Sequence, residues 1–257
     1  MAKWAKFPQL GEFSYTATSV RKHWSRLHAS DCEPCPSAQA ELSAWALFHN
    51  GDFEAATEAG LKAGGSGITA ANKATCIYAN YLEPKESKRI DLFMAAALRA
   101  EAQQADNPDN INAWYLQAYA LGRYSQGISV ARALAEGLGT KVRKALETTI
   151  RLAPSHADAH IALAAFHAEV IDKVGALIGG MTYGAKKETG LRHYQTALRL
   201  NPQSPIAMVE YANGMVMLEG DWRMNEANAL YEQAIQIQPA DAMERLDVEM
   251  AKAEMAG

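Results

Sequence analysis

The sequence has few cysteines, no apolar run long enough to cross a membrane and no excess of basic residues. Its three cysteines, Cys32, Cys35 and Cys76, are a low, odd number; this argues against a disulfide framework and fits a reducing compartment. The most prominent uncharged apolar run, residues 174–185, is well short of the about 20 residues that span a bilayer. A net charge of −4 does not favour nucleic acid as a partner.

Targeting and catalytic motifs are also missing. Residues 1–20 contain two lysines but neither an apolar core segment nor a small-residue cleavage site, so we expect no signal peptide and a cytoplasmic protein. The stretch GLGTK at 137–141 lacks the ending of a phosphate-binding loop, and no GxSxG, HExxH or GxGxxG motif occurs. We therefore expect a protein that is not an enzyme and needs no cofactor.

What the sequence does contain is a repeated pattern anchored on prolines. Small residues follow the prolines at two fixed distances, and bulky residues follow each small one. Counted from Pro108, Pro154 and Pro202, alanine stands at +5 and +10, with bulky residues at +6 and +13: Ala113, Ala159, Ala207; Ala118, Ala164, Ala212; Trp114, His160, Met208; Leu121, His167, Met215. Upstream of Pro154, Pro202 and Pro239 lie Leu146, Tyr194 and Tyr231 at −8, and Thr149, Ala197 and Ala234 at −5. Such spacing puts small and large residues on one helix face, so that neighbouring helices pack closely. Proline then separates one helix from the next.

These residues resemble the tetratricopeptide repeat family, whose unit is a pair of helices. The stretch 226–239 is similar to the family's second helix and 112–122 to its first, whereas 41–64 and 71–101 match less closely. The resemblance covers roughly residues 37–239. It implies an all-α, right-handed solenoid of about five helix pairs that binds partners along a concave groove.

The spacing departs from the family in two repeats. Successive prolines are 46, 48 and 37 residues apart, whereas the family period is about 34. We therefore expect extra material between first and second helix, at 124–142 and 170–187. Inserts of this kind are loosely similar to those of TRAP transporter T-component proteins and of the regulator of microtubule dynamics family.

The chain accordingly divides into three predicted parts. Residues 1–36 form an N-terminal segment with a helix and the CEPC loop, and residues 37–239 form the repeat domain. Residues 240–257 carry an apolar stripe, typical of a helix that caps the last repeat.

The resemblance also assigns groove-facing positions on the first helices of the repeats. They combine aromatic, polar and apolar side chains: Asn112, Tyr115, Tyr119, Arg123, Asp158, Ile161, Val209 and Asn213. This mixture suits an amphipathic peptide or helix, with the two tyrosines as anchors. An alternative is that the groove is filled by residues 1–30 of the chain itself.

Two further sites remain open as alternatives. The second insert offers an apolar set for a lipid tail or other small ligand, Leu177, Ile178, Met181 and Tyr183, but lengthened helices or an oligomer contact explain it as well. The N-terminal segment offers His23, His28, Cys32 and Cys35 as weak metal-ligand candidates. His28 and Cys32 are too close in sequence for a zinc finger, so a structural loop is favoured. His156, His160 and His167 share a helix stripe, but two of them occupy packing positions.

The sequence therefore predicts a non-catalytic scaffold that binds a protein or peptide partner in a concave groove. The alternatives are a carrier of a small apolar ligand and a metal-bearing module at residues 23–35. An oligomer is compatible with the pattern.

Overall fold

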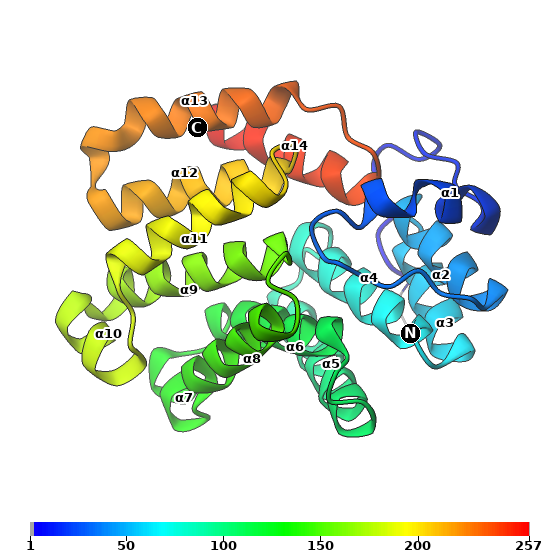
Figure 1. The fold of residues 1–257 in the computed structure, drawn as a ribbon, viewed down its shortest axis with the longest axis horizontal. Coiled ribbons are helices and arrows are strands. Elements are labelled where there is room, and N and C mark those ends of the chain that lie inside the picture. The colour runs from blue at the N-terminus through cyan, green and yellow to red at the C-terminus, as the bar shows by residue number, and fades with distance from the viewer. Residues whose placement is uncertain (1–2, 257) are drawn as a thin grey trace. The chain divides into compact units, whose positions relative to one another are not determined.

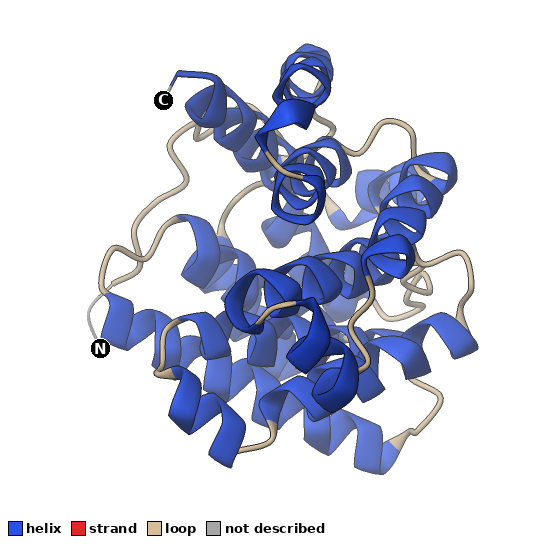
Figure 2. Cartoon of the chain, turned by 90° about the vertical axis from the view of Figure 1, so that its left-hand side faces the viewer, coloured by secondary structure: helices blue, strands red, loops and turns tan. Residues whose placement is uncertain are grey.

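A computed structural model describes residues 3–256, and its regular elements in that range are helices, without a strand (Figure 2). The chain forms two compact units. Unit 1 comprises residues 1–28, 32–148 and 240–243, and unit 2 comprises residues 29–31, 149–239 and 244–257. The all-α class expected from the periodic pattern is confirmed.

Unit 1 contains the N-terminal helices and most of α8 (Figure 1). The helices are α1 Ala17–Leu27, α2 Gln39–His49, α3 Phe53–Ala63, α4 Gly67–Tyr81, α5 Glu86–Asp106, α6 Ile111–Gln126, α7 Val130–Ala135 and α8 Leu138–Leu152. Each of α2 to α5 packs on the helix that follows it, and α2 also touches α4, as α4 touches α6. First helices therefore contact first helices, as a repeat of helix pairs requires.

Unit 2 repeats this arrangement with the helices that follow. They are α9 Ala157–Val174, α10 Ala176–Tyr183, α11 Lys187–Leu200, α12 Pro205–Glu219, the 3₁₀ turn η1 Asp221–Arg223, α13 Met224–Gln236 and α14 Ala242–Ala256, of which residues 242–243 belong to unit 1. α9 packs on both α11 and α12, and α12 packs on α13 (Figure 1).

The proline joints end one helix and cap the next. Asn110 and Ser204 accept hydrogen bonds from the backbone N–H groups of Ala113 and Ala207, at the starts of α6 and α12. Such a cap is worth about 1 kcal/mol. At the middle joint, the cap of α9 is not the hydroxyl of Ser155 but the imidazole of His156, which accepts from Ala159 N.

The small residues of the pattern lie in the core. Ala159, Ala164 and Ala212 have no exposed surface, and Tyr194 is 1% exposed. Between α11 and α12 the approach is so close that a Cβ added at Gly214 would lie 2.3 Å from the Tyr194 hydroxyl oxygen. The alternation of small and large side chains therefore sets the distance between helices.

The extra residues of the two long repeats form short helices. α7 lies between α6 and α8, and α10 lies between α9 and α11. Gly175 and Gly184, with φ of +81° and +64°, stand at the two ends of α10. This backbone conformation costs glycine little, so the two residues let the chain turn sharply into and out of the insert.

The C-terminal helix covers the last helix pair. Within unit 2, Ala251 of α14 joins Met208, Val209 and Tyr231 in one buried cluster, against which Met250 also packs. α14 therefore closes the apolar face that α12 and α13 would otherwise expose.

Candidate functional site

The first helix of the third pair, α6, carries the aromatic residues predicted to bind a partner. Tyr115, Tyr119 and Arg123 are spaced four apart, so they share one stripe of α6. The rings of Tyr115 and Tyr119 have centroids 6.2 Å apart, and the Arg123 guanidinium carbon lies 5.6 Å from the Tyr119 centroid. Tyr115 is 7% exposed, whereas Tyr119 and Arg123 are half-buried. The accessible part of the stripe is therefore the Tyr119–Arg123 pair.

At the start of α6 the chain covers its own surface. Asn112 is buried and its amide nitrogen donates a 2.7 Å hydrogen bond to Glu33 Oε2. Glu33 is buried as well, and the Trp24 indole nitrogen donates to its backbone oxygen at 2.7 Å. The loop that follows α1 thus occupies the position where a partner would meet Asn112. This contact falls at residue 33, outside the residues 1–30 that the alternative places in the groove, so that alternative stays a prediction.

The predicted residues of unit 2 are packed rather than open. Asp158, Ile161 and Val209 are all buried, and Val209 has no exposed surface. Ser30 covers the start of α9, because its carbonyl oxygen accepts from Asp158 N at 3.1 Å. Asn213 is half-buried and accepts a hydrogen bond from the Tyr231 hydroxyl. Of the four predicted groove residues in this unit, Asn213 alone keeps a substantial accessible surface.

The apolar residues of the second insert point outward. Leu177, Ile178 and Met181 on α10 are 77%, 57% and 82% exposed, and Tyr183 is half-buried. Side chains this exposed do not line a closed cavity. They form an apolar surface on a helix that packs against α9, and the structure does not support an enclosed ligand at these four residues.

Comparison with known proteins identifies the type of fold. No protein-family model and no curated protein matches this sequence. Among solved structures, a thermophilic TPR protein of Thermus thermophilus, TTC0263, superposes with a TM-score of 0.52 at 14% identity, over 93% of this chain and 100% of that chain. The chain has the fold of tetratricopeptide repeat proteins. A monomeric IFIT1 variant with m7Gppp-AAAA gives a TM-score of 0.46 at 13% identity, over 93% of this chain and 59% of that chain.

In the fourth helix pair, formed by α9 and α11, His160 and His167 occupy packing positions on the first helix. His160 contacts a histidine on the second helix. His160 Nδ1 on α9 lies 2.7 Å from His193 Nδ1 on α11, and His160 Nε2 lies 3.1 Å from the Pro154 carbonyl oxygen. Burial lowers the pKa of His193 to about 4, helped by the nearby charges of His160, His167 and Arg192. Burial also lowers the pKa of His160. Both rings are therefore neutral at pH 7.

His193 is absent from the residues selected on sequence grounds. It stands 33 positions after His160, and no local spacing links the two. One available signal is its place directly before Tyr194, a buried position of the tetratricopeptide register. The close contact between histidines is thus His160–His193, across two helices, and not along the stripe of His156, His160 and His167 on one helix.

The weak metal candidates of the N-terminal segment do not converge. His23 is exposed and its Nδ1 lies 2.9 Å from the Ser19 carbonyl oxygen, whereas His28 is buried and stacks on Trp24 at 4.0 Å. Cys32 and Cys35 are thiols that are not disulfide-bonded. Within residues 3–256 no group of three or more His, Cys, Asp or Glu side chains is arranged to hold a metal ion.

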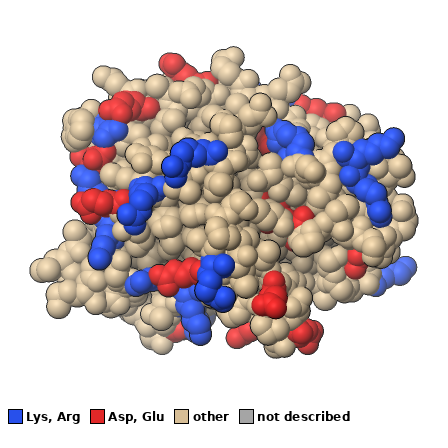
Figure 3. Space-filling view, viewed as in Figure 1, with Lys and Arg blue, Asp and Glu red and all other residues tan. Residues whose placement is uncertain are grey.

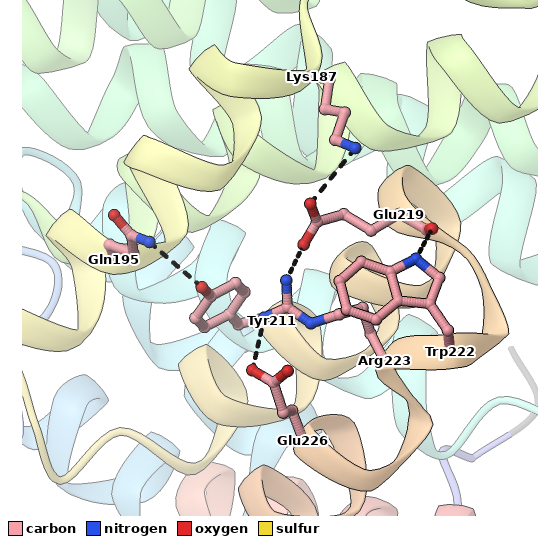
Figure 4. A network of polar contacts seen from close by, with 7 residues as sticks. All are labelled: Lys187, Gln195, Tyr211, Glu219, Trp222, Arg223 and Glu226. Atoms are coloured by element: carbon pink, nitrogen blue, oxygen red, sulfur yellow. Dashed lines mark hydrogen bonds and ion pairs between the residues drawn. The ribbon is translucent and has the colours of Figure 1, made fainter.

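The turn of the last tetratricopeptide repeat displays a tryptophan that the sequence pattern does not single out. Trp222 is 71% exposed, its indole nitrogen donates to the Glu219 carbonyl oxygen at 2.6 Å, and Arg223 lies 5.0 Å from its ring centroid. Glu219 binds both Arg223 and Lys187, and Arg223 also pairs with Glu226 (Figure 4). These contacts fix the turn between α12 and α13.

A membrane-spanning segment is not found among the helices of the described residues, because none combines the length and apolar character that a span needs.

Proposed function

We propose that this chain is a non-catalytic helical-repeat scaffold that binds a protein or peptide partner on the exposed face of α6. The observation that carries the proposal is the half-exposed Tyr119 ring with the Arg123 guanidinium held over it at 5.6 Å. Tyrosine and arginine are enriched among the residues that dominate binding energy at protein interfaces.

The pair is held in place before any partner arrives. Tyr115, packed below, contacts the Tyr119 ring, and the Arg123 Nη1 atom donates to Gln126 Oε1 at 3.4 Å. Side chains already fixed by packing lose little conformational entropy on binding, so more of the contact energy remains as affinity.

The chemistry of the pair indicates what kind of peptide it takes. The accessible part of the Tyr119 ring offers apolar contact, while the guanidinium of Arg123 pairs with a carboxylate. A partner segment that presents an apolar side chain close to an Asp or Glu fits both. The remaining predicted groove residues Asn112, Tyr115, Asp158, Ile161 and Val209 hold the helices in place, and Asn213 stays a proposed contact.

Two features of the rest of the molecule agree with a protein partner in a reducing compartment. On the face drawn in Figure 3, basic and acidic side chains are interspersed and no broad basic patch is visible. A nucleic-acid-binding surface typically has such a patch. Cys32, Cys35 and Cys76 are all in the thiol form, as is usual in the cytoplasm, so a cytoplasmic location is part of the proposal.

The test is a peptide-display selection on the full-length chain, followed by calorimetric titration of the selected peptides. Tyr119→Ala is expected to weaken binding at least tenfold, and Arg123→Ala to weaken most the peptides that contain a carboxylate. The matched control is Trp114→Ala, an aromatic on the same helix that is also half-buried but lies about 140° around the helix from Tyr119. Circular dichroism checks that helicity is kept. Selected peptides that bind Tyr119→Ala as tightly as the unmodified chain would contradict the proposal.

A further inference from the structure

Residues 3–7, which precede a turn at residues 8–11, lie on unit 1 as a bound peptide lies on a receptor. Residues 3–7 have no regular secondary structure. The Trp4 ring stacks on the Tyr78 ring of α4, with centroids 4.0 Å apart and planes inclined by 15°. The Tyr78 hydroxyl accepts a hydrogen bond from Ala5 N at 3.2 Å and donates one to Glu83 Oε2 at 2.8 Å. Trp4 and its neighbour are thus held by ring stacking and by a backbone contact.

Three residues later, Phe7 enters a pocket that depends on a glycine. Its side chain is 1% exposed and meets the Phe53 ring edge-on, with centroids 6.5 Å apart. A Cβ placed on Gly51 would lie 2.6 Å from the Phe7 ring. Gly51 also has φ +85°, a conformation in which glycine is favoured. The turn between α2 and α3 therefore has both the shape and the space to receive an aromatic ring.

A third contact binds the backbone of the segment. The side-chain amide of Asn50 accepts from Tyr15 N at 2.6 Å and donates to Tyr15 O at 2.9 Å. A bidentate pairing of an asparagine with the backbone of one residue does not depend on the side chain of that residue. The helices thus supply a ring platform, a pocket and a backbone clamp, which are the parts of a peptide-recognition site.

The side chains next to the two aromatic rings in the sequence take no part in these contacts. Ala5, Lys6 and Pro8 are exposed, so recognition falls on two aromatic rings three residues apart. A chain with three residues per turn, as in polyproline II, brings positions i and i+3 to the same side. Pro8 favours such extended backbone at Phe7.

We propose that the surface made by Asn50, Gly51, Phe53 and Tyr78 is a binding slot for an extended peptide with two aromatic residues three apart. In this structure the slot is occupied by the chain's own Trp4 and Phe7. A partner segment of the same pattern binds by displacing them. The site lies on α2 to α4 and is separate from the α6 pair proposed above, so either proposal can fail alone.

Occupancy by the chain's own segment predicts a measurable competition. A tethered segment acts at an effective concentration in the millimolar range. A free peptide with a dissociation constant of about 10 μM would then bind the unmodified chain roughly a hundredfold more weakly than it binds an open slot. Weakening the tethered segment must therefore strengthen binding of the same segment added in solution, which simple structural packing does not predict.

The experiment uses full-length protein and a fluorescein-labelled synthetic peptide of residues 3–16, followed by fluorescence anisotropy. The peptide is expected to bind Trp4→Ala/Phe7→Ala at least tenfold more tightly than the unmodified chain. A peptide in which both aromatic residues are alanine is expected not to bind. Adding Tyr78→Ala to the double variant removes the stacking platform and is expected to abolish binding.

Phe7→Ala alone serves as a second, milder variant and is expected to shift affinity in the same direction. If circular dichroism shows that both variants have lost their helices, the segment is an integral part of the fold and the proposal is wrong. It is also wrong if the peptide binds neither variant, or if the alanine peptide binds equally well. A dimer of the unmodified chain that the peptide dissociates would support the slot and identify its partner as a second copy of this chain.

Discussion

His49 Nδ1 lies 2.6 Å from Oδ2 of Asp241, a residue 192 positions further along the chain, and both side chains are buried. The other ring nitrogen of His49 lies 3.3 Å from His28 Nε2. The imidazole thus bridges a carboxylate and a second imidazole inside unit 1. Removing one partner of a buried ion pair is costly, because the remaining charge stays away from water.

Replacing His49 should therefore destabilise the protein strongly. We expect His49→Ala to lower the free energy of unfolding by about 3 kcal/mol, because it leaves Asp241 without this partner and removes a packed ring. Urea unfolding followed by circular dichroism measures the change. His23→Ala, an exposed histidine on α1, is the control and should change stability by less than about 0.5 kcal/mol. Equal effects of the two variants would show that the buried contact contributes nothing.

Two glycines inside helices should respond oppositely to alanine. At Gly214 the added methyl group would meet Tyr194 at 2.3 to 2.5 Å, so Gly214→Ala should destabilise by about 1–2 kcal/mol. At Gly122 nothing lies within 4 Å, so Gly122→Ala should stabilise by up to about 1 kcal/mol through helix propensity. Thermal melts of both variants test the pair. A higher Tm for Gly214→Ala would mean that α11 and α12 are less tightly packed than described.

The His160–His193 pair should make unit 2 sensitive to mild acid. The pKa of His193 is lowered to about 4 in the folded chain, whereas it is about 6.5 when unfolded. Between these values the unfolded state binds more protons, so the stability contributed by the neutral ring is present above pH 6.5 and is lost as the pH falls toward 4.

His193→Gln should flatten this part of the stability profile. Because the imidazole is partly exposed, we expect the lost slope to correspond to about 1 kcal/mol rather than to the full pKa difference. Thermal unfolding between pH 4.5 and 7.5 measures it, with His23→Gln as the matched control. An unchanged slope in His193→Gln would assign the acid sensitivity to other groups.

Tryptophan substitutions should separate core from surface. Trp45 has no exposed surface and Trp222 is 71% exposed. Trp45→Ala should cost about 3–5 kcal/mol, whereas Trp222→Ala should cost less than about 1 kcal/mol, because it loses one hydrogen bond and the contact with Arg223. Denaturant titration compares the two. A large loss in Trp222→Ala would show that the α12–α13 turn stabilises the fold.

The three thiols should react at different rates. Cys76 is 1% exposed, and burial raises its pKa to about 12, so its reactive thiolate is scarce and inaccessible. Cys35 is exposed. In native protein a chromogenic disulfide reagent should label Cys35 first and Cys76 only after denaturant is added. Cys35→Ser should remove the fast phase; a fast phase that persists in this variant would contradict the assignment.

The spacing of small and bulky residues predicts those features of the fold that depend on residues close together in the sequence. The spacing predicts helix contacts at Ala159, Ala164 and Tyr194, and all three residues are buried. Asn110 and Ser204, which stand beside the proline joints, cap α6 and α12. These features follow from residues within one helical turn of each other, where periodicity and capping chemistry are visible in the chain itself.

The candidate site is harder to predict from residue spacing. The resemblance places Asn112 and Val209 in an open groove, yet Glu33 covers Asn112 and Val209 lies in the core. Spacing shows which residues share a helix face, but it does not show which other segment will cover that face. The stacking of Trp4 on Tyr78 has no sequence signal for this reason.

The helices, their joints and the small residues at which helices meet follow from local sequence, because each depends on neighbours only a few positions away. In contrast, only the packing of distant helices brings His49 to Asp241, His160 to His193 and Phe7 into the space beside Gly51. Such pairs join parts of the chain that come together only when helices pack, and a buried polar or aromatic group is stabilised by whichever partner that packing brings within reach.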